Sequence, residues 1–332
     1  MKTILVPTDF SQDAHDTLLF ATEIASAIDA RIVLFHAFYQ QLSLSYSQDF
    51  TTAVNELERE RTEELEAYAD RFKAYAFDNF SVRFQSTAET GVKRETPVTK
   101  SGFHHVGIDT AAKRAGVSIR CACKFGFAFD EILKAVDVHR ADLVVMGMRG
   151  EGALRRALMG RTSINVMRDA KVPVLAVPLG TRFKGFGTIV FAADLFNLPH
   201  NTTFEFLRQF VKLFGSKLQI LHLYQENSLQ QEKEKALTSL DTLDRQLFGT
   251  DYKVVFQKEK DFANGITDYV QEQQASLLVL IPQKHPLLEG LLSRSLTQKI
   301  MAKAFAPLLA LPAVAVESMS AAQVKVAEEH HG

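Results

Sequence analysis

The sequence predicts an α/β fold built from two doubly wound domains in tandem, each with a five-stranded parallel sheet. Short and continuously apolar runs such as ILVP, IVLF, LVVM and VLAV alternate with amphipathic segments of helical period. Strands that are buried on both faces of a parallel sheet require such runs. The same pattern occurs twice along the 332 residues, a length that also favours two domains.

The elements of the first copy follow in order from these periods. Strands are expected near 3–8, 31–37, 117–124, 142–147 and 173–178. Helices are expected between them, near 11–28, 50–77, 128–140 and 160–170. With right-handed crossovers, this order gives a Rossmann-like, doubly wound domain.

The second copy repeats the first. Residues 3–38 and 188–224 each open with an apolar strand that leads to an aspartate, Asp9 or Asp194. Each continues through an amphipathic helix into a strand that ends in a histidine, and the copies close alike, on KVPVLAVP and FAPLLALP. Self-similarity at so long a period indicates duplicated domains.

The repeat sets the predicted domain limits. The first domain spans 1–180 with an insertion near 81–115, the second spans 181–313, and a flexible tail follows at 314–332. Each copy ends in a short apolar strand, and an edge strand of this kind must be covered. We therefore expect the two last strands to pair antiparallel as a pseudo-dimer within the chain, while further homodimerisation stays open.

The composition of the chain limits the classes of binding partner and the cellular compartments that can be expected. The 38 basic and 39 acidic side chains give a formal net charge of −1, which disfavours bulk nucleic-acid binding but not a small anionic ligand. No apolar run is long enough to span a membrane, and the N-terminus does not resemble a signal peptide. Cys121 and Cys123 stand two apart in an expected strand, a spacing that favours reduced, buried thiols over a disulfide. These features predict a cytoplasmic protein.

A glycine-rich run after the fourth strand is the most informative segment. It has the spacing G-x2-G-x9-G, followed by a cation and two hydroxyl side chains at the start of a helix. These residues are Gly147, Gly150, Gly160, Arg161, Thr162 and Ser163. Glycines allow backbone N–H groups to approach an anion, and a helix N-terminus favours negative charge. Because ligands of open α/β sheets bind at the carboxyl ends of the strands, Asp9 is expected at the same edge.

Other readings of these residues remain. Ala153 and Leu154 stand where a Walker loop needs Lys and Ser or Thr, and PTDFSQD after the first strand has no glycine. Both standard phosphate loops, the Walker loop and the dinucleotide-binding loop, are therefore excluded.

The glycines alone are also compatible with a simple strand-to-helix turn. In the insertion, His104 and His105 have no acidic or cysteine partner at ligand spacing, which argues against a metal site.

On the duplication and this motif, the chain up to about Pro312 resembles the universal stress protein family in its tandem form. The resemblance implies binding of ATP, with or without Mg²⁺. It implies that Thr8, Asp9 and Ala37 hold adenine and ribose. The phosphate residues that it implies are Gly147, Arg149, Gly150, Gly160, Arg161, Thr162 and Ser163. The family prefers Ser or Thr directly after the last glycine, so Arg161 either adds a phosphate contact or crowds the site.

The second copy has lost this motif. An ungapped alignment on Pro173 and Pro307 places Ile281, Lys284 and Arg294 where the first copy has its three glycines. Two prolines in the loop, Pro282 and Pro286, remove amide donors, whereas Ser295 and Thr297 remain. We expect no ATP in this half.

Together these features predict a nucleotide-binding stress-response or regulatory protein. No catalytic triad or metal-binding carboxylate cluster is recognisable, so we expect at most weak ATPase activity. The alternative is a scaffold or small-molecule sensor that binds no nucleotide and acts through the insertion or a pocket of the second domain. A nucleotidyl-transfer enzyme would need a triphosphate motif after the first strand, which is absent.

Overall fold

The structure is a computed structural model that describes most of the chain. The described residues are 1–41, 49–85, 116–148, 161–195, 198, 201–225, 239–282 and 294–312. Most of the predicted insertion and all of the predicted tail lie outside them.

Strands and helices alternate through the first half, as predicted. They are β1 (Thr3–Pro7), α1 (Gln12–Ile28), β2 (Arg31–Phe38), α2 (Phe50–Phe80), β3 (Ile119–Phe125), α3 (Ala128–Val138), β4 (Leu143–Gly147), α4 (Arg161–Asp169) and β5 (Val174–Val177). The main departure is α2, which runs to Phe80 rather than ending near residue 77. It stops where Ser81 adopts the left-handed conformation that commonly terminates helices.

The second half repeats this order. Its elements are β6 (Thr188–Ala192), α5 (Asn201–Phe214), β7 (Lys217–Tyr224), β8 (Tyr252–Lys258), α7 (Phe262–Glu272), β9 (Leu277–Leu280), α8 (Arg294–Lys303) and β10 (Leu308–Ala310). Between β7 and β8, residues 239–246 are also helical. The central strands of both halves are apolar and almost fully buried, which confirms the two-sided burial that their sequences predict.

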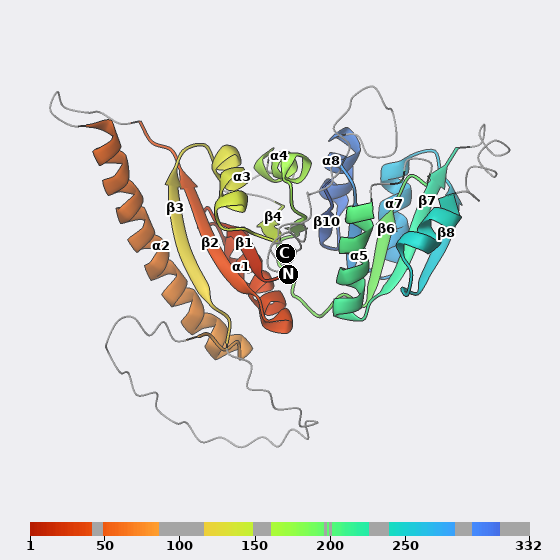
Figure 1. Cartoon of the computed structure of the whole chain (residues 1–332), viewed down its shortest axis with the longest axis horizontal. Helices are drawn as coiled ribbons and strands as arrows, with labels where there is room; N and C mark the ends of the chain where they lie inside the picture. The colour runs from red at the N-terminus through yellow and green to blue at the C-terminus, as the bar shows by residue number, and fades with distance from the viewer. Residues whose placement is uncertain are drawn as a thin grey trace, which may run out of the picture.

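In the described part of the chain, ten strands form one sheet. Its order is β3-β2-β1-β4-β5-β10-β9-β6-β7-β8, and every neighbouring pair within a half is parallel. Figure 1 shows the sheet crossing the molecule from β3 to β8, with the halves meeting between β4 and β10. The fold is therefore two tandem doubly wound α/β domains.

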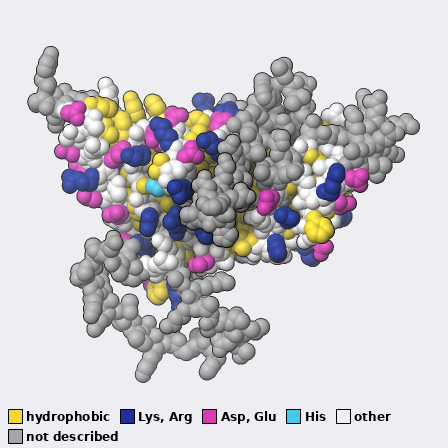
Figure 2. Space-filling model, viewed as in Figure 1, with side chains coloured by type: hydrophobic (Ala, Val, Ile, Leu, Met, Phe, Trp, Pro, Cys, Tyr) yellow, Lys and Arg dark blue, Asp and Glu magenta, His cyan; other side chains and the backbone are white. Residues whose placement is uncertain are grey.

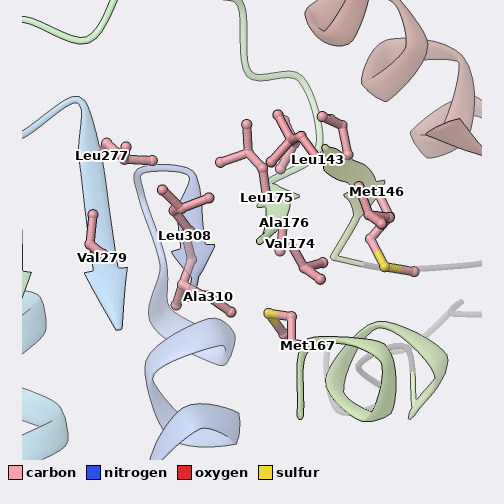
Figure 3. Packing of buried hydrophobic residues seen from close by; sticks show 14 of the residues in the cluster. Leu143, Met146, Met167, Val174, Leu175, Ala176, Leu277, Val279, Leu308 and Ala310 are labelled. Atoms are coloured by element: carbon pink, nitrogen blue, oxygen red, sulfur yellow. The ribbon is translucent and has the colours of Figure 1, made fainter. Parts of the chain in front are cut away.

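The halves join through their last strands. β5 and β10 pair antiparallel, with Leu175 opposite Leu309. Figure 3 shows the buried apolar side chains of both strands gathered at this junction. The predicted pairing of the two terminal strands is confirmed, and it covers an edge that each half would otherwise expose.

Helix α2 has 31 residues and is the longest described element. Its buried residues, Leu65, Ala69, Phe72 and Ala76, recur every three or four positions and so form one apolar face. That face packs against β3 and the neighbouring core. Within the described part of the chain, no helix is both long and apolar enough to cross a membrane.

The segment between β5 and β6 is anchored to both halves by aromatic side chains. Phe186 has its ring centroid 6.4 Å from that of Phe20 on α1 and 4.9 Å from that of Phe214 on α5. It also contacts Phe183 and Phe210, at 5.1 and 5.3 Å. One buried ring thus packs against helices of both halves.

A polar contact adds to this anchor. The guanidinium of Arg182 lies 3.7 Å from the ring centroid of Phe80, at the end of α2. It donates to Glu23 on α1 at 2.5 Å, and the other carboxylate oxygen of Glu23 accepts from the backbone N of Phe183 at 3.2 Å. The connecting segment is therefore held to the first half by both charge and stacking.

Candidate functional site

The turn after β1 carries the first group of predicted site residues. Thr8 is buried, and its backbone N donates to the carbonyl of Phe35 at 2.8 Å, which continues the β1–β2 pairing. His36, near the end of β2, donates from Nδ1 to the carbonyl of Thr8 at 2.8 Å. The hydroxyl of Thr8 accepts from the backbone N of Phe10 at 3.1 Å. Both the backbone and the side chain of Thr8 therefore hold this turn.

Asp9 leads from the turn into α1. Its Oδ1 accepts from the backbone N of Ser11 at 3.1 Å and from the Ser11 hydroxyl at 2.6 Å. Ser11 in turn caps α1 by accepting from Ala14 N at 3.2 Å. The carboxylate of Asp9 thus lies at the N-terminal end of a helix, at the carboxyl edge of the sheet.

Phe10 gives the turn its aromatic lining. It has a φ of 61°, a left-handed conformation that is rare for a phenylalanine. Its ring lies 4.7 Å from that of His36 and 5.3 Å from that of Tyr68 on α2, between centroids. Sequence reasoning did not include Phe10, His36 or Tyr68 in the site. Of these three, only His36 had a signal in the sequence, because both copies have a histidine at the end of this strand.

Ala37 follows His36 and is half-buried. Beyond it, exposed aromatic side chains border the site on the side of β3: Tyr39 and Phe127 stack with centroids 4.7 Å apart, and Phe50 lies exposed at the start of α2. Figure 2 shows hydrophobic side chains gathered at this end of the first half.

The second group of predicted residues follows β4. Gly147 is the last residue of that strand, and its carbonyl accepts from the hydroxyl of Ser163 at 2.7 Å. Helix α4 begins at Arg161, whose side chain is exposed, and Thr162 is half-buried. Ser163 is buried, so its hydroxyl proton is already committed to the β4–α4 connection. Arg149, Gly150 and Gly160 lie outside the described residues.

The sheet brings these two groups to one edge. β1 and β4 are parallel neighbours, with Ile4 opposite Leu143 and Leu5 opposite Val144. Their carboxyl ends, which carry Thr8 and Asp9 on one strand and Gly147 on the other, therefore lie side by side. The topology reverses direction between these strands, as expected for a ligand site in an open α/β sheet.

The second half has the same backbone frame but different side chains. Ala193 N donates to the carbonyl of Leu221 at 3.0 Å, as Thr8 does to Phe35. Nδ1 of His222 lies 3.3 Å from both the N of Leu195 and the O of Ala193. However, Leu195 is 1% exposed where the corresponding Phe10 is 39% exposed.

The end of β9 is also closed in this half. Ile281 and Pro282, which follow the strand, are both buried. Between α7, α8 and β9, a cavity of about 10 Å³ has the space of roughly one water. Among the described residues, the second half therefore has buried apolar side chains at the end of β9, where the first half has Gly147 at the end of β4.

The cysteines are not part of this edge chemistry. Cys121 and Cys123 lie on β3 as free thiols, the first half-buried and the second buried. Burial raises the pKa of Cys121 to about 12 and that of Cys123 to about 11. Both are therefore neutral at physiological pH. The sequence predicted two buried, reduced thiols; both are free thiols in the structure, but only Cys123 is fully buried. Among the residues that the structure describes, no group of three His, Cys, Asp or Glu side chains is placed to hold a metal ion.

Comparisons with known proteins agree with the fold. The family model described as "Universal stress protein family" matches residues 1–178 and 185–312. A universal stress protein from Thermus aquaticus is 29% identical over 176 residues, which are 53% of this chain and 98% of that protein.

Solved structures show the same likeness. A universal stress protein from Archaeoglobus fulgidus aligns with a TM-score of 0.61 and 16% identity, over 94% of this chain and 98% of that one. Another structure from that organism, solved in complex with dAMP, covers 38% of this chain and 98% of its own at 17% identity and a TM-score of 0.31. The nucleotide belongs to that protein, and so distant an alignment carries nothing about the site of this one.

Proposed function

Because the chain belongs to the universal stress protein family, we propose that its first half binds one adenine nucleotide, ATP with or without Mg²⁺, and acts as a stress-response or regulatory protein. The observation that carries the proposal is the meeting of two strand ends at one edge of the sheet, where Thr8 and Asp9 follow β1 beside Gly147, the last residue of β4. This is the edge at which α/β sheets bind ligands.

The proposed ligand lies across this edge. Adenine and ribose contact Thr8, Asp9 and Ala37, where a half-exposed Phe10 supplies an aromatic wall. The phosphates extend toward the N-terminus of α4, whose unpaired N–H groups favour an anion. The proposed phosphate residues are Gly147, Arg149, Gly150, Gly160, Arg161, Thr162 and Ser163. Ser163 already donates to Gly147, so in this arrangement its backbone N is the group left for phosphate.

The second half is proposed to bind no ATP. Its loop has Ile281, Lys284 and Arg294 in place of the glycines, and the described part of that loop is buried. The proposal therefore predicts one nucleotide per chain. It assigns no efficient catalysis, only weak ATPase activity at most.

Isothermal titration with ATP tests the proposal. A stoichiometry near one supports it, and Gly150→Val is expected to abolish binding because a side chain blocks the backbone approach. Asp9→Ala is expected to weaken binding by roughly 1–3 kcal/mol, because a polar group of the enclosed ligand would lose its hydrogen-bond partner. Asp194→Ala, the matching change in the second half, is expected to leave affinity unchanged.

Two further variants sharpen the result. Asp9→Asn retains an oxygen that can accept from Ser11, so it separates loss of the local turn from loss of a ligand contact. Arg161→Ser weakens ATP more than adenosine if Arg161 binds phosphate, and tightens ATP if it obstructs the site. A stoichiometry near two, or ATP binding that survives Gly150→Val, would refute the assignment to the first half.

A further inference from the structure

Two exposed aromatic side chains stack on each other beside the candidate site. Tyr39, directly after β2, is 61% exposed, and Phe127, directly before α3, is 62% exposed. Their ring centroids are 4.7 Å apart, and the ring planes differ by 18°. Contiguous apolar groups that stay exposed on separate elements often mark a binding site.

Backbone and side-chain contacts fix this aromatic pair in place. The backbone N of Gly126 donates to the carbonyl of Phe38 at 2.8 Å, which ties the turn after β3 to the end of β2. Glu58 on α2 accepts from the backbone N of Phe125 at 3.1 Å. The ring of Phe125 in turn contacts that of Tyr39, with the centroids 5.6 Å apart. The fold itself therefore holds the two exposed rings.

The aromatic pair lies on the face of the sheet that carries the proposed phosphate residues. Phe127 leads into α3, which packs on β2 and against α4. Figure 1 shows α3 and α4 side by side. In the order β2-β1-β4, the ends of β2 and β4 are two strand spacings apart, about 10 Å. A ligand with its phosphates at the N-terminus of α4 that extends across β1 and Ala37 therefore reaches Tyr39 with its other end.

Phe127 occupies a position at which helix chemistry favours a small polar residue. It is the N-cap of α3, and its side chain accepts no hydrogen bond from the first turn. Ser, Thr, Asp and Asn are preferred at N-caps because their side-chain oxygen accepts from a backbone N–H group of that turn. Departures from such local rules concentrate at functional sites. The aromatic ring at this N-cap is therefore best explained by a ligand.

The second half makes the same backbone frame without the aromatic pair. The backbone N of Glu259 donates to the carbonyl at the end of β7 at 2.9 Å, which matches the bond between the turn after β3 and the end of β2. Gln225 follows β7 where Tyr39 follows β2. Asp261 is the N-cap of α7 and accepts from two backbone N–H groups of the first turn. The frame thus needs no aromatic side chains, and they occur in the half that carries the glycine motif.

We propose that Tyr39 and Phe127 bind the base of the nucleotide by stacking and make the first half selective for purine over pyrimidine nucleotides. The inference rests on the proposed function, because the phosphates of the same ligand lie at α4. The two rings are already in contact, so the base stacks on the exposed face of the pair. A purine covers more of that face than a pyrimidine. Stacking reads no base edge, so this contact does not distinguish ATP from GTP.

Isothermal titration of the full chain with ATP, GTP and CTP tests the inference. These ligands share the triphosphate and differ in the base, so wild type is expected to bind ATP and GTP more tightly than CTP. Phe127→Ala removes one ring and is expected to weaken ATP binding roughly 5–100-fold, the usual worth of stacking one base. The loss for CTP is smaller, so the gap between ATP and CTP narrows. Phe127→Tyr keeps the ring and is expected to restore wild-type affinity.

Two controls separate the ring from the stability of α3. Phe127→Ser also removes the ring but supplies a helix cap, so it should melt roughly 2–4 °C above Phe127→Ala and bind ATP no more tightly. Phe77→Ala truncates a ring that is 58% exposed near the C-terminal end of α2, and is expected to bind all three nucleotides as wild type does.

The outcomes distinguish this inference from the proposed function. If wild type binds ATP and Phe127→Ala binds it equally well, or loses ATP and CTP by the same factor, the pair does not bind the base and the proposed function stands. Recovery of affinity by Phe127→Ser would show that binding follows the stability of α3, and would also overturn the inference alone. If wild type binds none of the three nucleotides, both are overturned.

Discussion

Removal of one ring from the connecting segment is predicted to destabilise the whole chain. Phe186 is 2% exposed and contacts four other phenylalanines on the connecting segment, α1 and α5. Truncation of a buried phenylalanine to alanine costs about 3–5 kcal/mol, part of it for the cavity left behind. Phe183 and Phe214 stay in mutual contact at 5.9 Å and can close some of that cavity. We therefore expect Phe186→Ala to lose about 3 kcal/mol, near the lower end of the range.

Urea unfolding followed by far-UV circular dichroism measures this loss. The slope with urea should be unchanged, so that the midpoint alone reports stability. Phe186→Leu, which keeps most of the volume, should lose less than about 1.5 kcal/mol. Phe248→Ala makes the same chemical change at a side chain that is 78% exposed, and should stay within about 0.5 kcal/mol of wild type. A loss below about 1 kcal/mol for Phe186→Ala would refute the view that this ring joins the two halves.

Three further outcomes follow from contacts described above. Burial raises the pKa of Cys121 to about 12 and that of Cys123 to about 11. A thiol reagent at pH 8 should therefore label the native protein far more slowly than the urea-unfolded chain. Equal labelling rates would contradict the burial of these thiols. Arg182→Met keeps packing on the neighbouring ring but leaves Glu23 without its cation, and should cost about 1–2 kcal/mol by thermal unfolding. Arg182→Lys should restore less than half, because an ammonium lacks the planar fork. Leu309→Asp places a charge at a fully buried junction position and should abolish cooperative folding; a native-like melting curve would argue against the β5–β10 pairing.

The sheet and the duplication could be read from the sequence because they depend on local patterns. Continuous apolar runs predict buried parallel strands. Both copies end in similar apolar segments, KVPVLAVP and FAPLLALP, and this similarity predicted that these two strands pair. Thr8, Asp9 and Gly147 could be placed at one edge because parallel strands end on the same side. This much of the candidate site follows from topology alone.

The contacts that complete the site are long-range and could not be predicted. Tyr68 reaches the turn from α2 only because of the rotation of that helix on β3, which no local period specifies. The hydrogen bond that the Ser163 hydroxyl donates to the Gly147 carbonyl likewise depends on how closely α4 approaches β4. The stacking of Arg182 on Phe80 joins residues about a hundred positions apart, at the far end of a helix that runs further than its sequence period indicates.

The antiparallel pairing of β5 with β10 joins partners that already share one chain. Separate subunits meeting through such strands would part on dilution, whereas tethered partners hold each other at an effective concentration on the order of millimolar, however little protein is present. In a symmetric pair, any substitution also appears in both members. Here the second half has Ile281, Lys284 and Arg294 at the positions aligned with the three glycines of the first half, and it also has the strand that covers β5. Because the two halves are covalently linked, the second half can cover β5 permanently although its loop differs in sequence from the loop of the first half.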